Sequence, residues 1–315
     1  MTAFTELLGC RFPIQQAPMG GVSSAPQLPV AVAAAGGFGM LSAVLQPAEV
    51  LAATLAVLPS RAAIGVNFLV PFLEDRAAVE VAAARVPLVD FFWGEPDAAL
   101  ISLVHDGGAL ASWQVGSVEE ARAAAEAGCD LVVVQGVEAG GHVRGRLGLL
   151  ALLDLVLEAV DVPVIAAGGL ATERSVAAVL AAGAAAARVG TRFVATHEAR
   201  AEGAHPDYVD ALLRSRGEDT VLTEAYSAMW PAAPHRVLAS CIEAASAGDS
   251  AMVGETSMGG ATFGVPRWAV VSPNASTTGE IAAMALYAGQ GVGAVNWIGS
   301  AADVVHELAG QKVQI

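Results

Sequence analysis

Short apolar runs alternate with longer Ala/Leu-rich amphipathic stretches over the first two thirds of the chain. The runs recur roughly every 20–30 residues, a spacing typical of βα units. They predict eight strands, at Ile14–Ala17, Phe38–Ser42, Ile64–Asn67, Leu88–Phe92, Ala109–Gln114, Leu131–Gln135, Val164–Ala167 and Ala187–Val189. Because each run is continuously apolar, we expect a parallel sheet buried under helices. The pattern favours an α/β (β/α)₈ TIM barrel, with an open doubly wound sheet as the alternative.

The stretches between these runs have the signals that begin and end helices. Ser117 and Thr172 precede two of them as N-caps, and Gly128 and Gly183 follow two as C-terminal glycines. The predicted helices are Pro26–Ala35, Pro47–Leu58, Glu74–Ala84, Val118–Ala127, Leu149–Ala159 and Thr172–Ala182. Helices at these places would cover the outside of the barrel.

The alternation fails after Arg192, which indicates a second structural unit. We predict that residues 1–204 and 276–315 form the barrel and that 205–275 form a small helical domain, or lid, that caps the substrate site. Helical pieces and the glycine-rich stretch Gly254–Gly264 suggest this unit. Beyond it we expect a helix at Ile281–Gly289, a loop at Gly291–Gly293 and a final helix from Ala301 that packs back on the barrel.

Composition narrows the class of protein. The chain has 315 residues and is 55% hydrophobic, so it can bury a large core. Its formal net charge of −15 would repel phosphate backbones and anionic lipid, so we expect neither a nucleic-acid nor a membrane partner. Cys10, Cys129 and Cys241 are odd in number and lack metal-ligand spacing. Together with the absence of a signal-peptide pattern, they predict reduced thiols and a cytoplasmic protein.

In a parallel barrel the active site lies at the carboxyl ends of the strands. The residues that follow the predicted strands are small or polar: Ala17-Pro18-Met19-Gly20-Gly21, Asn67, Gln114, Gln135 with Gly140-Gly141-His142, Gly168-Gly169 and Gly190-Thr191. Their gathering at one rim is a stronger signal than any single motif, and it predicts the reactive site there.

The two glycine pairs after the last two strands predict a phosphate site. Glycine lets the backbone approach an anion closely, free N–H groups at a helix start favour it, and the Thr191 hydroxyl can add a donor. The alternative is that Gly168-Gly169 and Gly190 only make tight turns. Asn67 and Gln135 offer amide donors and acceptors, as the edge of an isoalloxazine or of a pyrimidine-like ring needs. They would otherwise pin loops.

His142 is the candidate catalytic residue. It follows two glycines, so its ring can point into the pocket, and an ordinary imidazole is a ready acid or base near neutral pH. Glu138 would either orient this ring or stabilise the loop. Of the other histidines, His197 lies close enough to the last strand to approach the site, whereas His235 has helical surroundings.

Several other chemistries lack their motifs. No histidine pair has metal-ligand spacing, so we expect no metal site. No Gly-x-Ser-x-Gly turn occurs, which disfavours acyl transfer. The aromatic residues Phe91, Phe92 and Trp93 are expected to divide between core and pocket wall. Trp230 and Trp268 lie in the capping segment and could face a substrate, although packing is favoured.

Taken together, these motifs resemble the nitronate monooxygenase family, formerly called 2-nitropropane dioxygenases. The resemblance runs from about residue 10 to residue 200. The motifs that carry it are Pro13-Ile14-Gln15-Gln16-Ala17-Pro18-Met19, Gly36-Gly37-Phe38-Gly39, Gly65-Val66-Asn67, Gln135-Gly136-Val137-Glu138-Ala139-Gly140-Gly141-His142, Ala166-Ala167-Gly168-Gly169 and Val189-Gly190-Thr191-Arg192-Phe193.

The resemblance implies an oxidoreductase that holds FMN in the barrel, with a second domain closing over it. His142 would be catalytic beside the flavin. The residues implied to bind FMN are Ala17, Met19, Asn67, Gln135, Gly140, Gly168, Gly169, Arg188, Val189, Gly190 and Thr191. The implied reaction oxidises an alkyl nitronate, or a nitroalkane, with O₂ to a carbonyl compound and nitrogen oxides. The resemblance leaves a homodimer open.

Two other functions stay open at this stage. Some relatives are NAD(P)H-dependent flavin reductases that act on quinones or on enoyl-acyl-carrier-protein. The latter share the Glu-Ala-Gly-Gly-His loop but usually have an acidic residue at the position of Gln135. The chain also departs from common family patterns at Phe91-Phe92-Trp93-Gly94 and at Arg144, which leaves the substrate open. A non-redox aldolase or isomerase barrel is disfavoured, because Lys312 is the only lysine.

Overall fold

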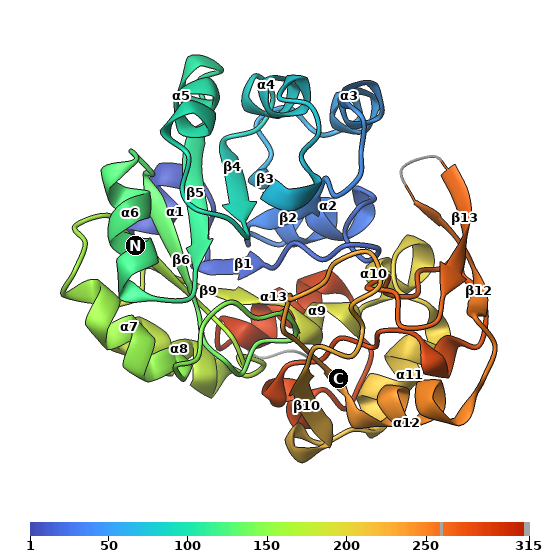
Figure 1. Ribbon diagram of the computed structural model, residues 1–315. Helices are drawn as coiled ribbons and strands as arrows, with labels where there is room; N and C mark the ends of the chain where they lie inside the picture. The colour runs from blue at the N-terminus through green and yellow to red at the C-terminus, as the bar shows by residue number, and fades with distance from the viewer. Residues whose placement is uncertain (259–260, 312–315) are drawn as a thin grey trace.

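The computed structural model describes residues 1–258 and 261–311, and its centre is a parallel β-barrel (Figure 1). Its strands, in chain order, are β1 (Ile14–Gln16), β2 (Gly39–Ser42), β3 (Ile64–Leu69), β4 (Leu88–Phe92), β5 (Leu110–Val115), β6 (Leu131–Gln135), β8 (Val164–Ala167) and β9 (Ala186–Val189). They form one eight-stranded sheet in the order β1-β9-β8-β6-β5-β4-β3-β2. A parallel bridge between Gln15 and Phe38 joins its two edges. The predicted (β/α)₈ barrel is confirmed, with each strand within two residues of its expected bounds.

Helices follow the strands and cover the outside of the barrel. They are α2 (Gln27–Ala34), α3 (Ala48–Ala56), α4 (Ala77–Ala83), α5 (Ala98–Asp106), α6 (Val118–Glu126), α7 (Leu149–Leu157) and α8 (Glu173–Ala181), then α9 (Thr191–Val194), α10 (His197–Glu202) and α13 (Ala301–Leu308). The two predicted N-caps are present. The Ser117 hydroxyl accepts from the N–H of Glu120, and the Thr172 hydroxyl accepts from that of Ser175.

Side chains alternate between the inside and the outside of the barrel, as the two-residue period of a strand requires. Inside, an apolar layer at the amino ends of the strands includes Phe38, Leu88 and Ile165. Helix α1 (Ala3–Leu8) closes this end, and its Phe4 packs edge-on against Phe38 at 5.7 Å. Polar side chains replace the apolar ones one layer higher, so the barrel is filled below and polar toward its carboxyl end.

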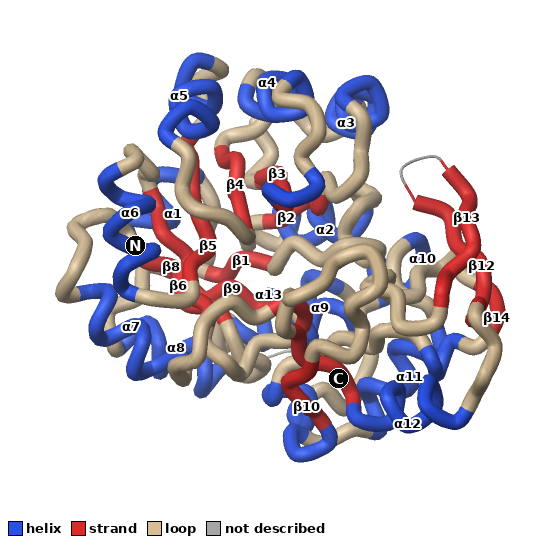
Figure 2. The backbone as a smooth tube through the Cα atoms, viewed as in Figure 1, coloured by secondary structure: helices blue, strands red, loops and turns tan. Residues whose placement is uncertain are grey.

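The segment 205–275 contains the expected helical pieces and also strands that the sequence did not predict. It contains α11 (Pro206–Arg214), η2 (Gly217–Asp219), β10 (Thr220–Thr223), β11 (His235–Leu238), α12 (Ala239–Ala247), β12 (Met252–Met258) and β13 (Ala261–Pro266). Runs such as Thr220–Thr223 carry β-branched residues, which favour a strand. Strand β12 pairs with β13 on one side and with β14 (Thr278–Gly279) on the other, and the three form a small antiparallel sheet at one edge of the molecule (Figure 2). The proposed domain boundaries stay a prediction.

The chain after residue 275 differs from the prediction in two places. The expected helix Ile281–Gly289 is only the 3₁₀ turn η3 (Ile281–Ala283), after which the chain is extended. There the N–H of Leu238 donates to the carbonyl of Leu286, so pairing with β11 replaces helical hydrogen bonds. The expected loop Gly291–Gly293 lies inside the 3₁₀ helix η4 (Gln290–Ala294). The final helix is confirmed as α13. None of the described helices is long and apolar enough to cross a membrane.

Candidate active site

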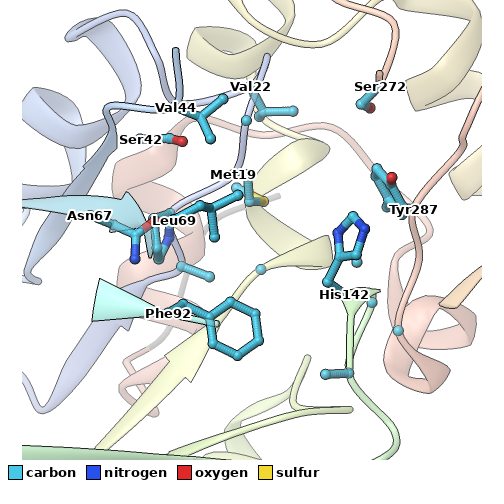
Figure 3. A pocket seen from close by; sticks show the side chains of 18 of the residues that line it. Met19, Val22, Ser42, Val44, Asn67, Leu69, Phe92, His142, Ser272 and Tyr287 are labelled. Carbon is cyan, nitrogen blue, oxygen red and sulfur yellow. The ribbon is translucent and has the colours of Figure 1, made fainter. Parts of the chain in front are cut away.

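A cavity of about 240 Å³ opens at the carboxyl ends of the barrel strands. Strand ends and the loops after them form one side of it, and residues from 205–275 and the chain near Tyr287 form the other. In Figure 3, Met19, Asn67 and Leu69 lie across the cavity from His142 and Tyr287. This is the rim where the sequence predicted the reactive site.

The structure brings together almost all of the residues expected to bind a cofactor or substrate. The predicted residues that line the cavity are Ala17, Met19, Asn67, Gln135, Gly140, His142, Gly168, Gly169, Arg188, Gly190 and Thr191. Val189 is the exception, because alternate residues of β9 point to opposite faces: Arg188 points into the barrel, whereas Val189 is fully buried in the core outside it. A cofactor would therefore meet only the backbone of Val189.

The strand-end side of the cavity presents backbone and hydroxyl donors. Gly169 has a φ of +68°, and a Cβ there would lie 3.0 Å from the Cβ of Glu138. The N–H of Gly169 has no acceptor among residues 1–258 and 261–311. The Thr191 hydroxyl accepts from the N–H of Gly289 at 3.0 Å, which leaves its proton free to donate. These groups offer the features that an anion needs.

A buried ion pair lies directly below the cavity. Asp90, on β4, is fully buried, and its carboxylate accepts from both terminal nitrogens of Arg188, at 2.9 and 3.0 Å. It also accepts from the Ser112 hydroxyl at 2.6 Å and from the Asn67 side-chain amide at 2.8 Å. Buried charges persist when they are paired and hydrogen-bonded, and this carboxylate is both. A lone acid in the apolar run of β4 was the signal for it, and sequence reasoning missed it.

Most of the remaining donors of Arg188 are also occupied within the protein. Its Nε donates to the side-chain carbonyl of Gln15 at 2.6 Å, and one terminal nitrogen donates to that of Gln114 at 2.8 Å. A guanidinium has five N–H groups, and these contacts use four of them, so one remains for a ligand. Arg188 is therefore suited to contact a cofactor ring, whereas it has little capacity left to neutralise a phosphate.

The polar side chains of the reactive loop hold the loop together. The Gln135 amide donates to the carbonyl of His142 at 2.8 Å and accepts from the N–H of Arg144 at 3.4 Å. The Glu138 carboxylate accepts from the N–H of Leu149, the first residue of α7, at 3.0 Å. Of the alternatives left open by the sequence, these contacts favour loop stabilisation for both residues. Glu138 does not orient the histidine ring.

His142 is fixed by a short strand that the sequence did not predict. Strand β7 (Gly141–His142) pairs antiparallel with β11, so that His142 lies opposite His235. The indole of Trp230 stacks on the His142 ring, with centroids 4.0 Å apart and planes 27° apart. The Nε2 atom of His142 is buried and has no hydrogen-bond partner in the described part of the chain. His142 lines the cavity, and its ring keeps a nitrogen that no described group hydrogen-bonds.

Burial makes His142 a neutral imidazole at neutral pH. Loss of hydration lowers its pKa to about 3, and the nearby His235 adds to this effect. Burial also lowers the pKa of His235, whose Nδ1 lies 2.8 Å from the carbonyl of Ala233. The sequence predicted an acid or base with an ordinary pKa near neutrality, and that prediction was wrong because burial lowers the pKa of His142. His235 lies on a strand, so its helical assignment was also wrong.

An aromatic wall, defined as Phe72, Phe92, Trp230 and Tyr287, lines the cavity around His142. Trp93 stands behind it, 5.0 Å from Trp230, and is held at a left-handed φ of +64°. The expected division of the Phe-Phe-Trp run is confirmed in part, because Phe91 is in the core and Phe92 lines the cavity. Trp230 fits both interpretations that the sequence left open, because it packs against Phe72 and His142 and also lines the cavity.

The other candidates lie away from the site. His197 is exposed at the start of α10 and does not line the cavity. His105 contacts Asp130 at 2.8 Å on the outside of the barrel. Burial raises the pKa of Cys10 and of Cys129 to about 12, which makes both thiols poor nucleophiles. Within the described ranges, no group of three or more His, Cys, Asp or Glu side chains could hold a metal ion.

Comparison with known proteins identifies the family. A family model described as nitronate monooxygenase matches residues 61–311, which is most of the chain and includes the reactive loop. The chain belongs to the nitronate monooxygenase family. It is therefore an oxidoreductase, and the resemblance seen in the sequence motifs is confirmed.

Curated relatives of this family member carry two kinds of name. A "(3aS,4S,5R,7aS)-5-hydroxy-7a-methyl-1-oxo-octahydro-1H-indene-4-carboxyl-CoA dehydrogenase" of Rhodococcus jostii is 36% identical over 244 residues, 75% of this chain and 65% of that protein. The chain thus spans slightly less than two thirds of that relative. A nitronate monooxygenase of Paraburkholderia phytofirmans is 34% identical over 275 residues, 71% of this chain and 74% of that protein.

The similar solved structures likewise include enzymes with different names. FabK from Thermotoga maritima matches with a TM-score of 0.78 at 26% identity, covering 98% of this chain and 94% of that one. A nitroalkane oxidase from Streptomyces ansochromogenes matches with a TM-score of 0.76 at 31% identity, covering 98% of both chains. These similarities support the barrel and the family, and they leave the substrate undecided.

Proposed function

We propose that this family member is an FMN-dependent nitronate monooxygenase, which oxidises alkyl nitronates or nitroalkanes with O₂ to carbonyl compounds and nitrogen oxides. The observation that carries the proposal is the unpartnered Nε2 of His142, buried at an apolar cavity that also has anion-binding donors on its far side. Family membership and the nitronate monooxygenases among its relatives support the same reaction.

The donor set on the strand-end side suits FMN. The free N–H of Gly169 and the hydroxyl of Thr191 would hold the phosphate. A Cβ at residue 169 would lie 3.0 Å from the Cβ of Glu138, so a side chain there would have to displace the reactive loop that carries Glu138. Asn67, Met19 and Arg188 would border the ring system. When bound, FMN supplies the electron transfer, and the protein supplies position and polarity.

The chain's own residues explain how a substrate proton would be handled. A neutral His142 can accept the proton from the carbon that bears the nitro group of a nitroalkane. The imidazolium so formed lies beside the negatively charged nitronate, and that opposite charge offsets the burial that otherwise disfavours it. The stack of Trp230 keeps the ring in one orientation and excludes water from one of its faces.

The second candidate function is an NAD(P)H-dependent flavin reductase acting on a quinone or an enoyl thioester. The dehydrogenase relative and the similarity to FabK favour it. The cavity is compatible with either candidate function, because its apolar wall can contact an apolar electron acceptor as well as an alkyl nitronate.

One comparison of rates separates the two candidates. The purified protein should release FMN on denaturation and consume O₂ rapidly with an alkyl nitronate. With NAD(P)H and a quinone or enoyl thioester, oxidation of the nucleotide should be slow. The reverse ranking would favour the reductase. A colourless protein that cannot be reconstituted with FMN would contradict both.

A further inference from the structure

Trp93 connects two features of the chain that the proposed function does not explain. The run Phe91-Phe92-Trp93-Gly94 and Arg144 both depart from common family patterns, and in the structure they meet: the guanidinium carbon of Arg144 lies 5.8 Å from the centroid of the Trp93 ring. The Trp93 indole also contacts the His142 ring, with centroids 5.8 Å apart and planes at 83°. Trp93 does not line the cavity, so it can affect a reaction there only through its neighbours.

The Trp93 ring packs against both members of the stack that holds His142. The indole of Trp230 covers one face of the imidazole at 4.0 Å, and Trp93 meets that indole edge-on, with centroids 5.0 Å apart. Phe72 also contacts Trp230, at 4.9 Å, but among the aromatic side chains of residues 1–258 and 261–311 only Trp93 contacts both rings of the stack. Edge-to-face aromatic pairs are stabilising beyond their buried area. Loss of Trp93 would therefore free Trp230 to move away from His142.

The backbone at Trp93 has a conformation that tryptophan rarely adopts. Its φ of +64° lies in the left-handed region, where Cβ crowds the following carbonyl. The next residue, Gly94, has a φ of +139°, and its carbonyl accepts from the indole nitrogen of the buried Trp113 at 3.3 Å. Such residues persist where the surrounding structure fixes them, and they cluster near functional groups. This turn therefore fixes the place of the Trp93 ring beside the stack.

Arg144 holds Trp93 from the same loop that carries His142. Its Nε donates to the Glu120 carboxylate on α6, and a terminal nitrogen donates to the Glu95 carboxylate at 3.0 Å. These ion pairs hold a side chain that is 21% exposed, and a guanidinium over an indole is attracted to the ring face. Arg144 thus links α6 and the turn after β4 to the reactive loop.

We propose that Trp93 is a positioning residue for His142: it holds the indole of Trp230 against the imidazole, and Arg144 with its two carboxylate partners holds Trp93 in place. The inference rests on the proposed function for the role of His142 in the reaction. The arrangement of the rings exists without turnover, so it can be tested by spectroscopy as well as by kinetics.

The first experiment measures the position of the His142 ring in the holoprotein. Protein labelled with carbon-13 at the histidine Cε1 atoms gives a proton signal for each of its six histidines, and the signal of His142 is the one lost in His142→Gln. An indole stacked at 4.0 Å moves this signal upfield through its ring current. In Trp93→Leu the signal should move toward that of an unstacked imidazole. In Trp93→Phe, which keeps an edge-on ring and the same backbone strain, it should stay near the wild-type position.

The control removes an aromatic ring with similar contacts away from the cavity. Phe12 lies 4.9 Å from the guanidinium carbon of Arg11 and 6.1 Å from the ring of His306. Phe12→Leu should leave the His142 signal unchanged. A folded Trp93→Leu protein whose His142 signal is equally unchanged would overturn the inference.

Steady-state kinetics test the consequence for the reaction. The substrate is nitroethane or its nitronate, whichever the wild type oxidises faster. Since Trp93 does not line the cavity, Trp93→Leu should lower kcat by about 10–100-fold, as expected for a displaced reacting group, while KM stays within about twofold. Trp93→Phe should restore most of kcat.

The two readouts separate this inference from the proposed function. A wild-type protein that oxidises neither form of nitroethane, but whose His142 signal depends on Trp93, contradicts the function and leaves the positioning intact. A protein that oxidises nitroethane as fast in Trp93→Leu as in the wild type supports the function and overturns the positioning role.

Arg144 variants test how Trp93 is held, and they decide the question if Trp93→Leu does not fold. Arg144→Met removes both ion pairs and the cation over the indole, so it should move the His142 signal in the same direction as Trp93→Leu and lower kcat by a smaller factor. Arg144→Lys keeps the charge without the planar guanidinium and should recover part of the loss. Arg76→Met removes the exposed ion pair with Asp97 and should change neither readout. If Arg144→Met behaves like Arg76→Met, the inference fails.

Discussion

The two sides of the cavity differ in how the chain builds them. The strand-end side consists of residues that follow consecutive parallel strands, such as Asn67, Gly169 and Thr191, and it is polar. The aromatic wall comes from a 3₁₀ turn, the end of a strand, a loop near residue 230 and an extended segment near residue 287. His142 lies on the loop that follows strand β6, as the residues of the first side follow their strands. It contacts the second side, however, because β7 pairs with β11.

This difference separates two kinds of structural information. Parallel pairing brings strand ends to one rim whatever the loops do, so the strand-end side follows from the alternation of elements. The wall depends on pairings between segments distant in sequence, such as β11 with β7 and Leu238 with Leu286. The following experiments test the two sides against each other, from the largest expected effect to the smallest.

Replacing the residue shared by both sides should have the largest effect. His142→Ala should lower kcat by about 10²–10⁴-fold, as expected for loss of a positioned base, while FMN content stays unchanged. Oxygen uptake with an alkyl nitronate measures the first, and absorbance after denaturation measures the second. His197→Ala, at an exposed position, is the control. Full activity of His142→Ala would leave the ring with a structural role only.

The layer beneath the strand-end side should dominate stability. Asp90→Ala leaves the buried Arg188 without its carboxylate and should lower the free energy of unfolding by about 3–5 kcal/mol. Asp97→Ala removes an ion pair with Arg76 in which both side chains are exposed, and it should cost less than about 1 kcal/mol beyond the loss of the helix cap. Urea denaturation measures both. Similar losses in the two variants would contradict the assigned role of the buried pair.

The glycine cradle can be tested with a control of matched conformation. Gly169→Ala and Gly9→Ala place Cβ at φ of +68° and +67°, but only the first meets another atom within 4 Å. Each should lose about 1–2 kcal/mol of stability from the left-handed backbone. Only Gly169→Ala should also retain less FMN after purification. If both variants keep their FMN, Gly169 does not border the cofactor.

The smallest expected effect is on the pH dependence of stability, which tests whether the aromatic wall keeps water from His142. Burial holds the pKa of His142 at about 3, below its ordinary value near 6.5, so the unfolded chain binds a proton first as the pH falls. Stability linked to His142 is thus complete above pH 6.5 and declines toward pH 3. Between pH 7 and about pH 5.7, wild-type protein should lose about 1 kcal/mol more than His142→Gln in denaturation measurements. Parallel losses would mean that the wall does not desolvate the ring.

The sequence predicted the barrel accurately because its signal is local and repeated. Each parallel strand is a continuous apolar run, and each helix begins and ends at a residue with a physical preference for that position, such as Ser117 or Gly183. The strands of the segment 205–275 were not predicted, because they are short and partly exposed, as at Thr220–Thr223. The polar side chains of the cavity rim were found for the same local reason as the strands that carry them.

By itself, the sequence determined that eight βα units close into a barrel and that His142 and the glycine pairs lie at its carboxyl rim. It did so because strand period and strand direction fix which residues reach that rim. Only the tertiary structure decided that Asp90 pairs with the guanidinium of Arg188, that Gln135 and Glu138 stabilise the reactive loop, and that Trp230 shields His142 from water. Those contacts join residues far apart in the chain, and their partners are chosen by packing, which no local pattern records.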